Sequence, residues 1–141
     1  MIVTAGTETK KWEERYVLDA VRHLGDPKKF NFYIKEFERR FAEYVGSKYA
    51  IATVNGTSAL HLGLLSLGVG KGDEVILPDM TYIACANVVS YVGATPVFVD
   101  IDPVRWCLDP SEVKKAITKK TKAIMPVWMY GQFPEMKEIK K

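Results

Sequence analysis

Apolar residues recur with a helical period in two stretches near the start of the chain. The first runs from Lys11 to Leu24 and the second from about Phe32 to Val45. Gly25 and Gly46 follow them, and glycine is a common helix terminator. We therefore predict two helices, with residues 1–10 as an arm or loop. In the second helix we expect one apolar face to pack in the interior, and it consists of Ile34, Phe37, Phe41 and Tyr44.

Beyond residue 48 the pattern changes to short apolar runs that alternate with helical stretches. The runs are apolar along their length instead of alternating, which is typical of strands buried on both faces of a parallel sheet. We predict an α/β fold, with a mostly parallel sheet and helices on both faces. The predicted strands are 49–54, 74–78, 96–100 and 122–127, and the predicted helices are 57–67, 79–92, 110–117 and 134–141.

The segment from Asn55 to Ser58 joins the first predicted strand to its helix. The first amides of a helix have no carbonyl partner, and the helix dipole places partial positive charge there, so this junction can receive an anion. Gly56 would let a phosphate approach the backbone, and the hydroxyls of Thr57 and Ser58 would add donors. The alternative is that Thr57 or Ser58 caps the helix and Gly56 turns the chain.

Parallel strands place their carboxyl ends at one edge of a sheet, where ligands bind in α/β folds. We therefore expect four loops to gather at this edge. They are residues 55–58, 78–82, 100–102 and 128–132.

Composition limits the classes of function. With 141 residues, 48% of them apolar, the chain is at most one globular domain or part of one. A net charge of +3 without an aromatic-interleaved basic stripe argues against nucleic-acid binding. No secretory signal or bilayer-length apolar run is present, so we expect a cytoplasmic protein that does not bind membranes. His23 and Cys107 lie in no metal-ligand spacing, so no metal site is expected.

Several ordered motifs together resemble the DegT/DnrJ/EryC1/StrS sugar aminotransferases, which use pyridoxal phosphate on the aspartate aminotransferase fold (fold type I). Each motif is weak alone, but the order and spacing are specific, and together they cover roughly residues 34 to 139. They are Glu36-Phe37-Glu38, Phe41-Ala42, Asn55 to Leu60, Gly72 to Ile76, Gly93 to Asp102, and Tyr130-Gly131-Gln132.

The resemblance implies a role for particular residues. Gly56, Thr57 and Ser58 match the family's cradle for the cofactor phosphate, in agreement with the anion site inferred above. Tyr82 matches the aromatic residue that lies against the cofactor ring, although it could simply pack at a helix start. Asn87 and Gln132 fall in motifs near the pocket, and a solvent-facing amide or a loop-bracing hydrogen bond is an equally good interpretation of each.

The resemblance also implies which parts of the catalytic machinery this chain contains. The family's Schiff-base lysine and the carboxylate that binds the pyridine nitrogen lie beyond the last matched motif, so we expect no catalytic residue here. We interpret residues 1–30 as an arm and helix, and 31–141 as the N-terminal part of a truncated cofactor-binding large domain. Two positions depart from the family pattern: Trp128, where a histidine is usual, and Glu135, where an aspartate is usual.

The function that the resemblance implies is amino transfer to a nucleotide-linked keto sugar, with glutamate as the expected donor and a homo-oligomer as the expected assembly. A catalytically inactive remnant or assembly module of the same fold is the alternative. An unrelated nucleotide-binding α/β module is disfavoured, because Gly68 to Asp73 matches neither a P-loop nor a Rossmann fingerprint.

Overall fold

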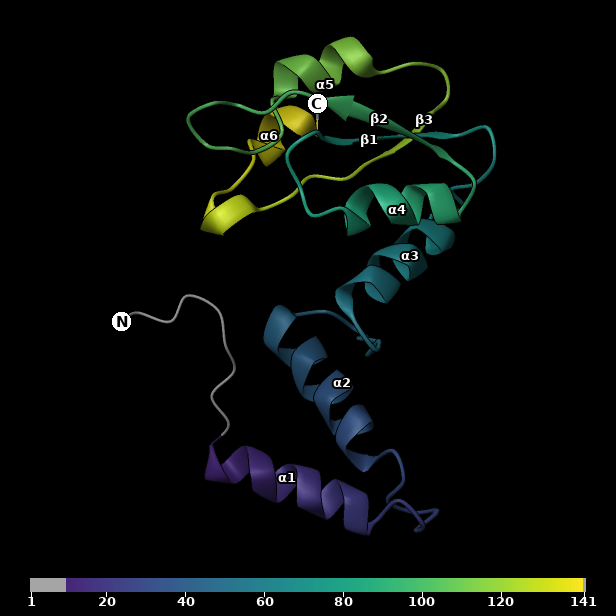
Figure 1. The fold of residues 1–141 in the computed structure, drawn as a ribbon, viewed down its shortest axis with the longest axis vertical. Coiled ribbons are helices and arrows are strands. Elements are labelled where there is room, and N and C mark those ends of the chain that lie inside the picture. Colours follow the sequence, from purple (N-terminus) through teal and green to yellow (C-terminus); the bar gives the residue numbers. More distant parts are fainter. Residues whose placement is uncertain (1–9, 141) are drawn as a thin grey trace. The chain divides into compact units, whose positions relative to one another are not determined.

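A computed structural model describes residues 10–140 (Figure 1). The chain divides into two compact units, Met1–Ala52 and Thr53–Lys141, which we describe one at a time. Among the described residues, no helix is long and apolar enough to cross a bilayer.

The first unit contains the two helices that the sequence predicts. Helix α1 spans Lys11–Arg22 and helix α2 spans Phe32–Val45. Gly46 ends α2 at a φ of 68°, a left-handed conformation that glycine adopts without a steric penalty. The polar face of α2 carries an ion pair between Glu36 and Arg40, with 2.6 Å between Oε1 and Nε. The expected helices of this region are thus confirmed.

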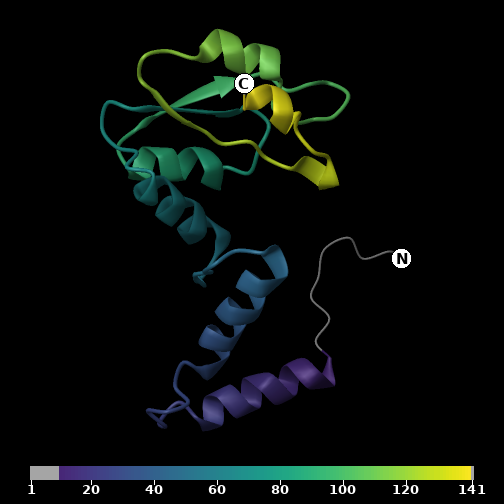
Figure 2. The same cartoon turned by 180° about the vertical axis from the view of Figure 1, so that it is seen from behind.

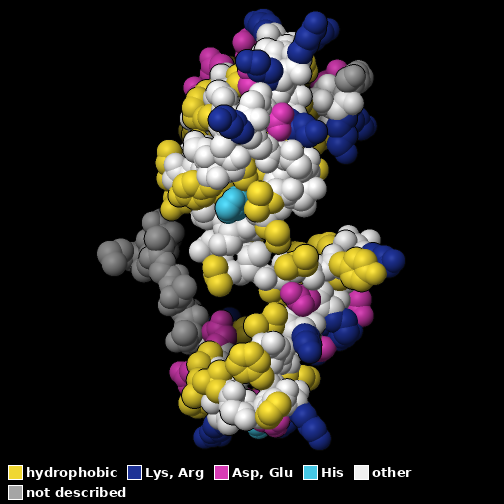
Figure 3. All heavy atoms as spheres, turned by 90° about the vertical axis from the view of Figure 1, so that its right-hand side faces the viewer, with side chains coloured by type: hydrophobic (Ala, Val, Ile, Leu, Met, Phe, Trp, Pro, Cys, Tyr) yellow, Lys and Arg dark blue, Asp and Glu magenta, His cyan; other side chains and the backbone are white. Residues whose placement is uncertain are grey.

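The expected burial of the apolar face of α2 is wrong. Its residues Ile34, Phe37, Phe41 and Tyr44 are exposed, and the rings of Phe37 and Phe41 stack on each other at 5.5 Å. The physical reason is that two helices cannot surround an apolar face, and Ala42 is the single buried residue that α1 and α2 contain. Hydrophobic side chains are accordingly visible on the molecular surface in Figure 3.

The second unit contains a parallel sheet of three strands. Strand β1 (Glu74–Pro78) lies in the centre, between β2 (Thr95–Val99) and β3 (Thr121–Ile124). Both neighbours run parallel to β1, with Ile76 opposite Val97 and Ile124. The predicted α/β class and parallel order are confirmed. The other elements are α3 (Gly56–Ser66), α4 (Ala84–Tyr91), α5 (Pro110–Ala116), the 3₁₀ turn η1 (Met129–Gly131) and α6 (Met136–Ile139).

Helices cover both faces of this sheet, with α4 on one face and α5 on the other in Figures 1 and 2. The alternation of β1 explains the two layers, because successive side chains point to opposite faces. Val75 packs in a cluster with Val88 and Val89 of α4, whereas Ile76 packs with Leu108 and Val113 beneath α5. Strand β1 is thus the centre of the core.

Some predicted elements differ from the structure. Residues 49–54 form no strand, and Tyr49, Ile51 and Val54 are exposed. A strand requires a neighbouring strand that pairs with its backbone groups, and none of the described strands pairs with this segment. Helix α4 begins at Ala84 and not at residue 79, because residues 79–83 form the loop that leaves β1. Strand β3 ends at Ile124 and not at 127.

Candidate functional site

The first turn of α3 has the geometry of an anion site. Asn55 precedes the helix in an extended conformation, and its Oδ1 accepts a hydrogen bond from the amide of Ser58 at 2.8 Å. Within residues 10–140, the amides of Gly56 and Thr57 donate to no protein acceptor. Two amides at the positive end of an 11-residue helix therefore stay available for a ligand.

Gly56 has no structural requirement of its own for glycine. Its backbone lies outside the left-handed region, and a Cβ at this position would meet no atom within 4 Å. Neither backbone strain nor tight packing therefore explains why this position is a glycine. Open space beside two free amides fits the close approach of a phosphate oxygen.

The capping alternative for Thr57 and Ser58 is wrong, because Asn55 provides the cap. Asparagine directly before a helix is a strong N-cap signal, so its position in the sequence could have revealed this role. The side chains of Thr57 and Ser58 are half-buried, and their hydroxyls make no hydrogen bond with any described residue. They remain candidate donors beside the free amides.

Tyr82 lies in the loop that connects β1 to α4 and is 75% exposed. The interpretation of Tyr82 as a packed residue at a helix start does not fit this exposure. Its backbone carbonyl accepts from the amide of Cys85 at 3.0 Å, which fixes the loop at the start of α4. The ring is thus free to lie against a flat ligand.

Asn87 and Gln132 occupy different environments. Asn87 is half-buried on α4, the helix that packs against α3. His61 of α3 and Tyr91 of α4 make an edge-to-face contact at 5.9 Å, so His61 lies between the two helices. Gln132 follows η1 and is exposed, and its amide donates to the carbonyl of Met129 at 2.9 Å. No described hydrogen bond or ring contact joins either residue to the first turn of α3.

Three of the four expected loops leave the same edge of the sheet. Residues 78–82, 100–102 and 128–132 follow the carboxyl ends of β1, β2 and β3, which are parallel. Residues 55–58 follow no described strand, since 49–54 is extended and unpaired. The expected gathering is thus confirmed for the three loops that strands position.

Comparison with known proteins decides the family. A sequence model of the DegT/DnrJ/EryC1/StrS aminotransferase family matches residues 11–141. The chain belongs to this family. In this member of the DegT/DnrJ/EryC1/StrS aminotransferases, the segment from Asn55 to Ser58 lies at a helix start where the amides of Gly56 and Thr57 have no acceptor among the described residues.

Curated relatives of this DegT/DnrJ/EryC1/StrS chain are named as enzymes of amino-sugar synthesis. It is 57% identical over 107 residues to GDP-perosamine synthase of Caulobacter vibrioides, which covers 76% of the chain and 29% of the relative. It is 54% identical over 99 residues to UDP-2-acetamido-2-deoxy-3-oxo-D-glucuronate aminotransferase of Pseudomonas aeruginosa, covering 70% of the chain and 28% of the relative. The chain thus spans less than a third of the length of these relatives.

Solved structures show the same architecture. The chain matches 3-amino-5-hydroxybenzoic acid synthase with a TM-score of 0.85 and 35% identity, over 96% of the chain and 35% of that protein. It also matches NtdA of Bacillus subtilis, solved with bound cofactor PMP, with a TM-score of 0.77 and 37% identity, over 89% of the chain and 30% of that protein. The fold is therefore that of the N-terminal part of these aminotransferases.

Proposed function

We propose that this chain is the phosphate-anchoring part of a pyridoxal-phosphate-dependent aminotransferase that acts on nucleotide-linked keto sugars, with glutamate as the amino donor. Family membership and the names of the relatives support the reaction class. The observation that carries the proposal is the first turn of α3, where the amides of Gly56 and Thr57 have no acceptor among the described residues. When bound, the cofactor would supply a ring that accepts electrons during amino transfer.

The chain's own residues would hold and orient that cofactor. The amides of Gly56 and Thr57, with the hydroxyls of Thr57 and Ser58, would bind its phosphate, because charge-assisted hydrogen bonds at a helix start are favourable. Tyr82, exposed in the loop before α4, would lie against its ring. Asn87 and Gln132 would contribute to the pocket wall. The catalytic lysine is not among these residues.

We also propose a cytoplasmic homo-oligomer, a dimer in its simplest form. The exposed apolar faces of α1 and α2 support this, because isolated soluble proteins rarely expose contiguous apolar surface. An assembly module that does not bind cofactor is the second candidate, and the same surface favours it. A measurement of cofactor binding distinguishes the aminotransferase part from the assembly module.

Titration with pyridoxamine phosphate tests the anchor. This form carries an amine in place of the aldehyde, so it forms no covalent adduct with surface lysines. The variant Gly56→Ala should weaken binding roughly tenfold or more, because a methyl group would occupy the space beside the amides. Isothermal titration calorimetry on the full chain measures the dissociation constant.

Gly63→Ala is the matched control. Gly63 lies in the same helix, and a Cβ there would also meet no atom within 4 Å, but it lies two turns from the free amides. It should bind pyridoxamine phosphate as the unmodified chain does. Equal affinity of the Gly56→Ala and Gly63→Ala variants would contradict the phosphate anchor and favour the assembly module.

A further inference from the structure

Two bulky aromatic residues in the second unit adopt a backbone conformation that side chains of their size rarely take. Trp106 has a φ of 56° and Tyr130 a φ of 49°. They are the two non-glycine residues between 10 and 140 with positive φ. Such conformations cost energy and occur preferentially where a ligand or an active site requires a side chain in a fixed place.

The two strained residues are in contact. Trp106 lies in the loop from β2 to α5, and Tyr130 lies in η1 after β3. Their ring centroids are 6.0 Å apart and the ring planes meet at 71°. Both segments follow the carboxyl ends of parallel strands, the edge where α/β sheets bind ligands (Figure 1).

These rings form one corner of a cavity of about 300 Å³. Hydrogen bonds fix Trp106, because its backbone amide donates to the carbonyl of Asp102 at 2.7 Å and its Nε1 donates to that of Pro103 at 3.1 Å. The position of the Trp106 ring is therefore fixed by hydrogen bonds within its own loop. The cavity is lined by Val104, Arg105, Trp106, Met129, Tyr130 and Gln132.

The lining has the chemistry of a site for a planar ring. Two nearly perpendicular aromatic faces let a flat group stack on one ring with its edge against the other. The side-chain amide of Gln132 has no hydrogen-bond partner among residues 10–140 and can pair with the polar edge of a heterocycle. The guanidinium of Arg105 lies at the rim, where Glu135 neutralises its charge.

We propose that this corner binds the base of the nucleoside diphosphate in the sugar nucleotide substrate. The inference rests on the proposed function, because it assigns a subsite to that substrate. The family match does not specify this subsite. In our proposal, Trp106 and Tyr130, the two residues with strained backbones, select a flat base by stacking. Base stacking on an aromatic ring accepts several bases, so the corner would recognise a nucleotide by its ring and not by one particular base.

Calorimetric titration of the full chain with GDP tests this subsite. GDP should bind, and ribose 5-phosphate, which has the phosphate without a base, should bind at least roughly tenfold more weakly. Trp106→Gly and Tyr130→Gly should each weaken GDP binding about tenfold, since glycine accepts the left-handed backbone while the ring is lost. Circular dichroism shows whether each variant folds. If one of the two variants does not fold, the other still tests the subsite.

Trp128→Ala is the control, because Trp128 is a neighbouring exposed aromatic residue that does not line the cavity. Its GDP affinity should equal that of the unmodified chain. Failure of the chain to bind GDP, or full GDP affinity in both glycine variants, would overturn the proposal. Equally tight binding of ribose 5-phosphate would overturn it as well.

Titration of the same variants with pyridoxamine phosphate separates this proposal from the proposed function. The Trp106→Gly variant should retain cofactor affinity, whereas Gly56→Ala should retain GDP affinity. If the chain binds GDP through Trp106 but binds no cofactor, the anchor fails and the subsite stands. If pyridoxamine phosphate displaces GDP from the chain, the two sites are one, and the subsite proposal is wrong.

Discussion

Asn55 and Ser58 are joined by a hydrogen bond of 2.8 Å from the amide of Ser58 to the Oδ1 of Asn55. This bond occupies one of the first amides of α3 and leaves those of Gly56 and Thr57 without a protein acceptor among the described residues. The same asparagine therefore stabilises the helix and determines which amides an anion can reach.

Replacing Asn55 separates these two roles. Asn55→Ala removes the cap and should lower the free energy of unfolding by about 1 kcal/mol. Asn55→Asp keeps an acceptor for the amide of Ser58, so stability should be retained, but its negative charge should repel a phosphate and weaken pyridoxamine phosphate binding. Chemical denaturation and calorimetry measure the two effects. An aspartate variant with undiminished cofactor affinity would place the phosphate elsewhere.

Asp109 caps α5 in the same way, with its Oδ1 accepting from the amide of Ser111 at 2.7 Å. Hydrogen bonds from the side chain and then the backbone of Ser111 lower the pKa of Asp109 below its usual value of 3.8. A lowered pKa stabilises the fold above the usual value, and this contribution disappears as the pH falls through the folded-state pKa.

We therefore expect Asp109→Ala to cost about 1 kcal/mol of unfolding free energy at pH 7 and less at pH 2. Asp109→Asn should keep most of the cap without its pH dependence. Denaturation curves at both pH values test this, and a cost for Asp109→Ala that is the same at pH 7 and pH 2 would argue against an ionised cap.

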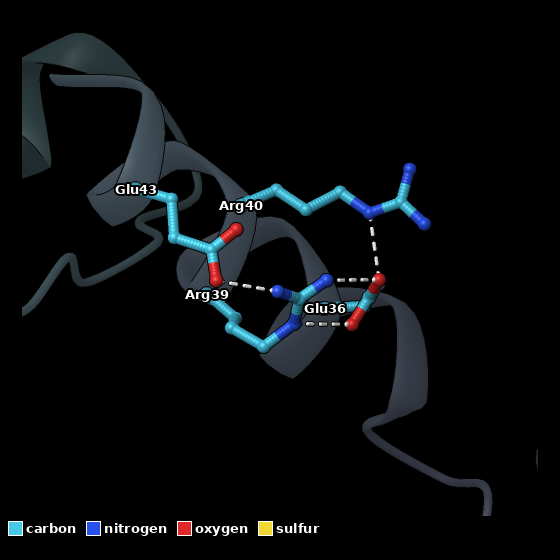
Figure 4. Close-up of polar contacts among 4 residues, drawn as sticks. All are labelled: Glu36, Arg39, Arg40 and Glu43. Carbon is cyan, nitrogen blue, oxygen red and sulfur yellow. Dashed lines mark hydrogen bonds and ion pairs between the residues drawn. The ribbon is translucent and has the colours of Figure 1, made fainter.

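Glu36 is the centre of a charged network on α2 (Figure 4). Its carboxylate lies 2.8 Å from Nη2 of Arg39 and 2.6 Å from Nε of Arg40, and Arg39 also pairs with Glu43 at 2.6 Å. Hydrogen bonds from Arg39 and then Arg40 lower the pKa of Glu36 to about 2. The pairs therefore persist to acidic pH and are lost as the pH falls through about 2.

The expected effect on stability is small, because exposed ion pairs gain little and salt screens them. Glu36→Gln should leave the unfolding midpoint nearly unchanged in high salt and lower it slightly in low salt. A carbon-detected NMR titration of Glu36 measures the pKa directly. A titration midpoint near 4.5, the ordinary pKa of a glutamate, would show that Arg39 and Arg40 do not pair with this carboxylate when the protein is in solution.

Ile76 tests the core of the sheet unit. It is fully buried at the middle of β1 and packs against Val99, Leu108 and Val113. Ile76→Ala should lower the free energy of unfolding by about 2–5 kcal/mol, because it removes buried methylene groups and leaves a cavity. Ile76→Val should cost about 0.5–1.5 kcal/mol, so the pair of variants distinguishes a lost-volume effect from a general defect.

The sequence predicted those elements whose formation depends on interactions between residues close together in the chain. The helical period and Gly46 predicted α2 with its observed ends, and the helix predicted at 110–117 begins at Pro110 as expected. Within α5 the carboxylate of Glu112 accepts a hydrogen bond from Nζ of Lys115 at 2.6 Å, an interaction of near neighbours along one helix face.

The candidate residues Gly56, Thr57 and Ser58 were visible in the sequence, but the capping role of Asn55 beside them was not predicted. The expectation named Thr57 or Ser58 as a possible cap, whereas the cap is Asn55. The sequence did not predict the backbone conformation of Trp106 and Tyr130, because large aromatic residues have no preference for the left-handed conformation that they adopt. The contact between their rings joins two loops that lie far apart in the chain.

The sequence by itself determined the parallel α/β class, the helices with clear periods and ends, and the candidate residues Gly56, Thr57 and Ser58. These follow from propensity, periodicity and capping, which act over a few residues. Only the tertiary structure decided that residues 49–54 stay unpaired, that the apolar face of α2 is exposed, and that Trp106 meets Tyr130. Each of these depends on which distant segment lies alongside, and no local pattern encodes that.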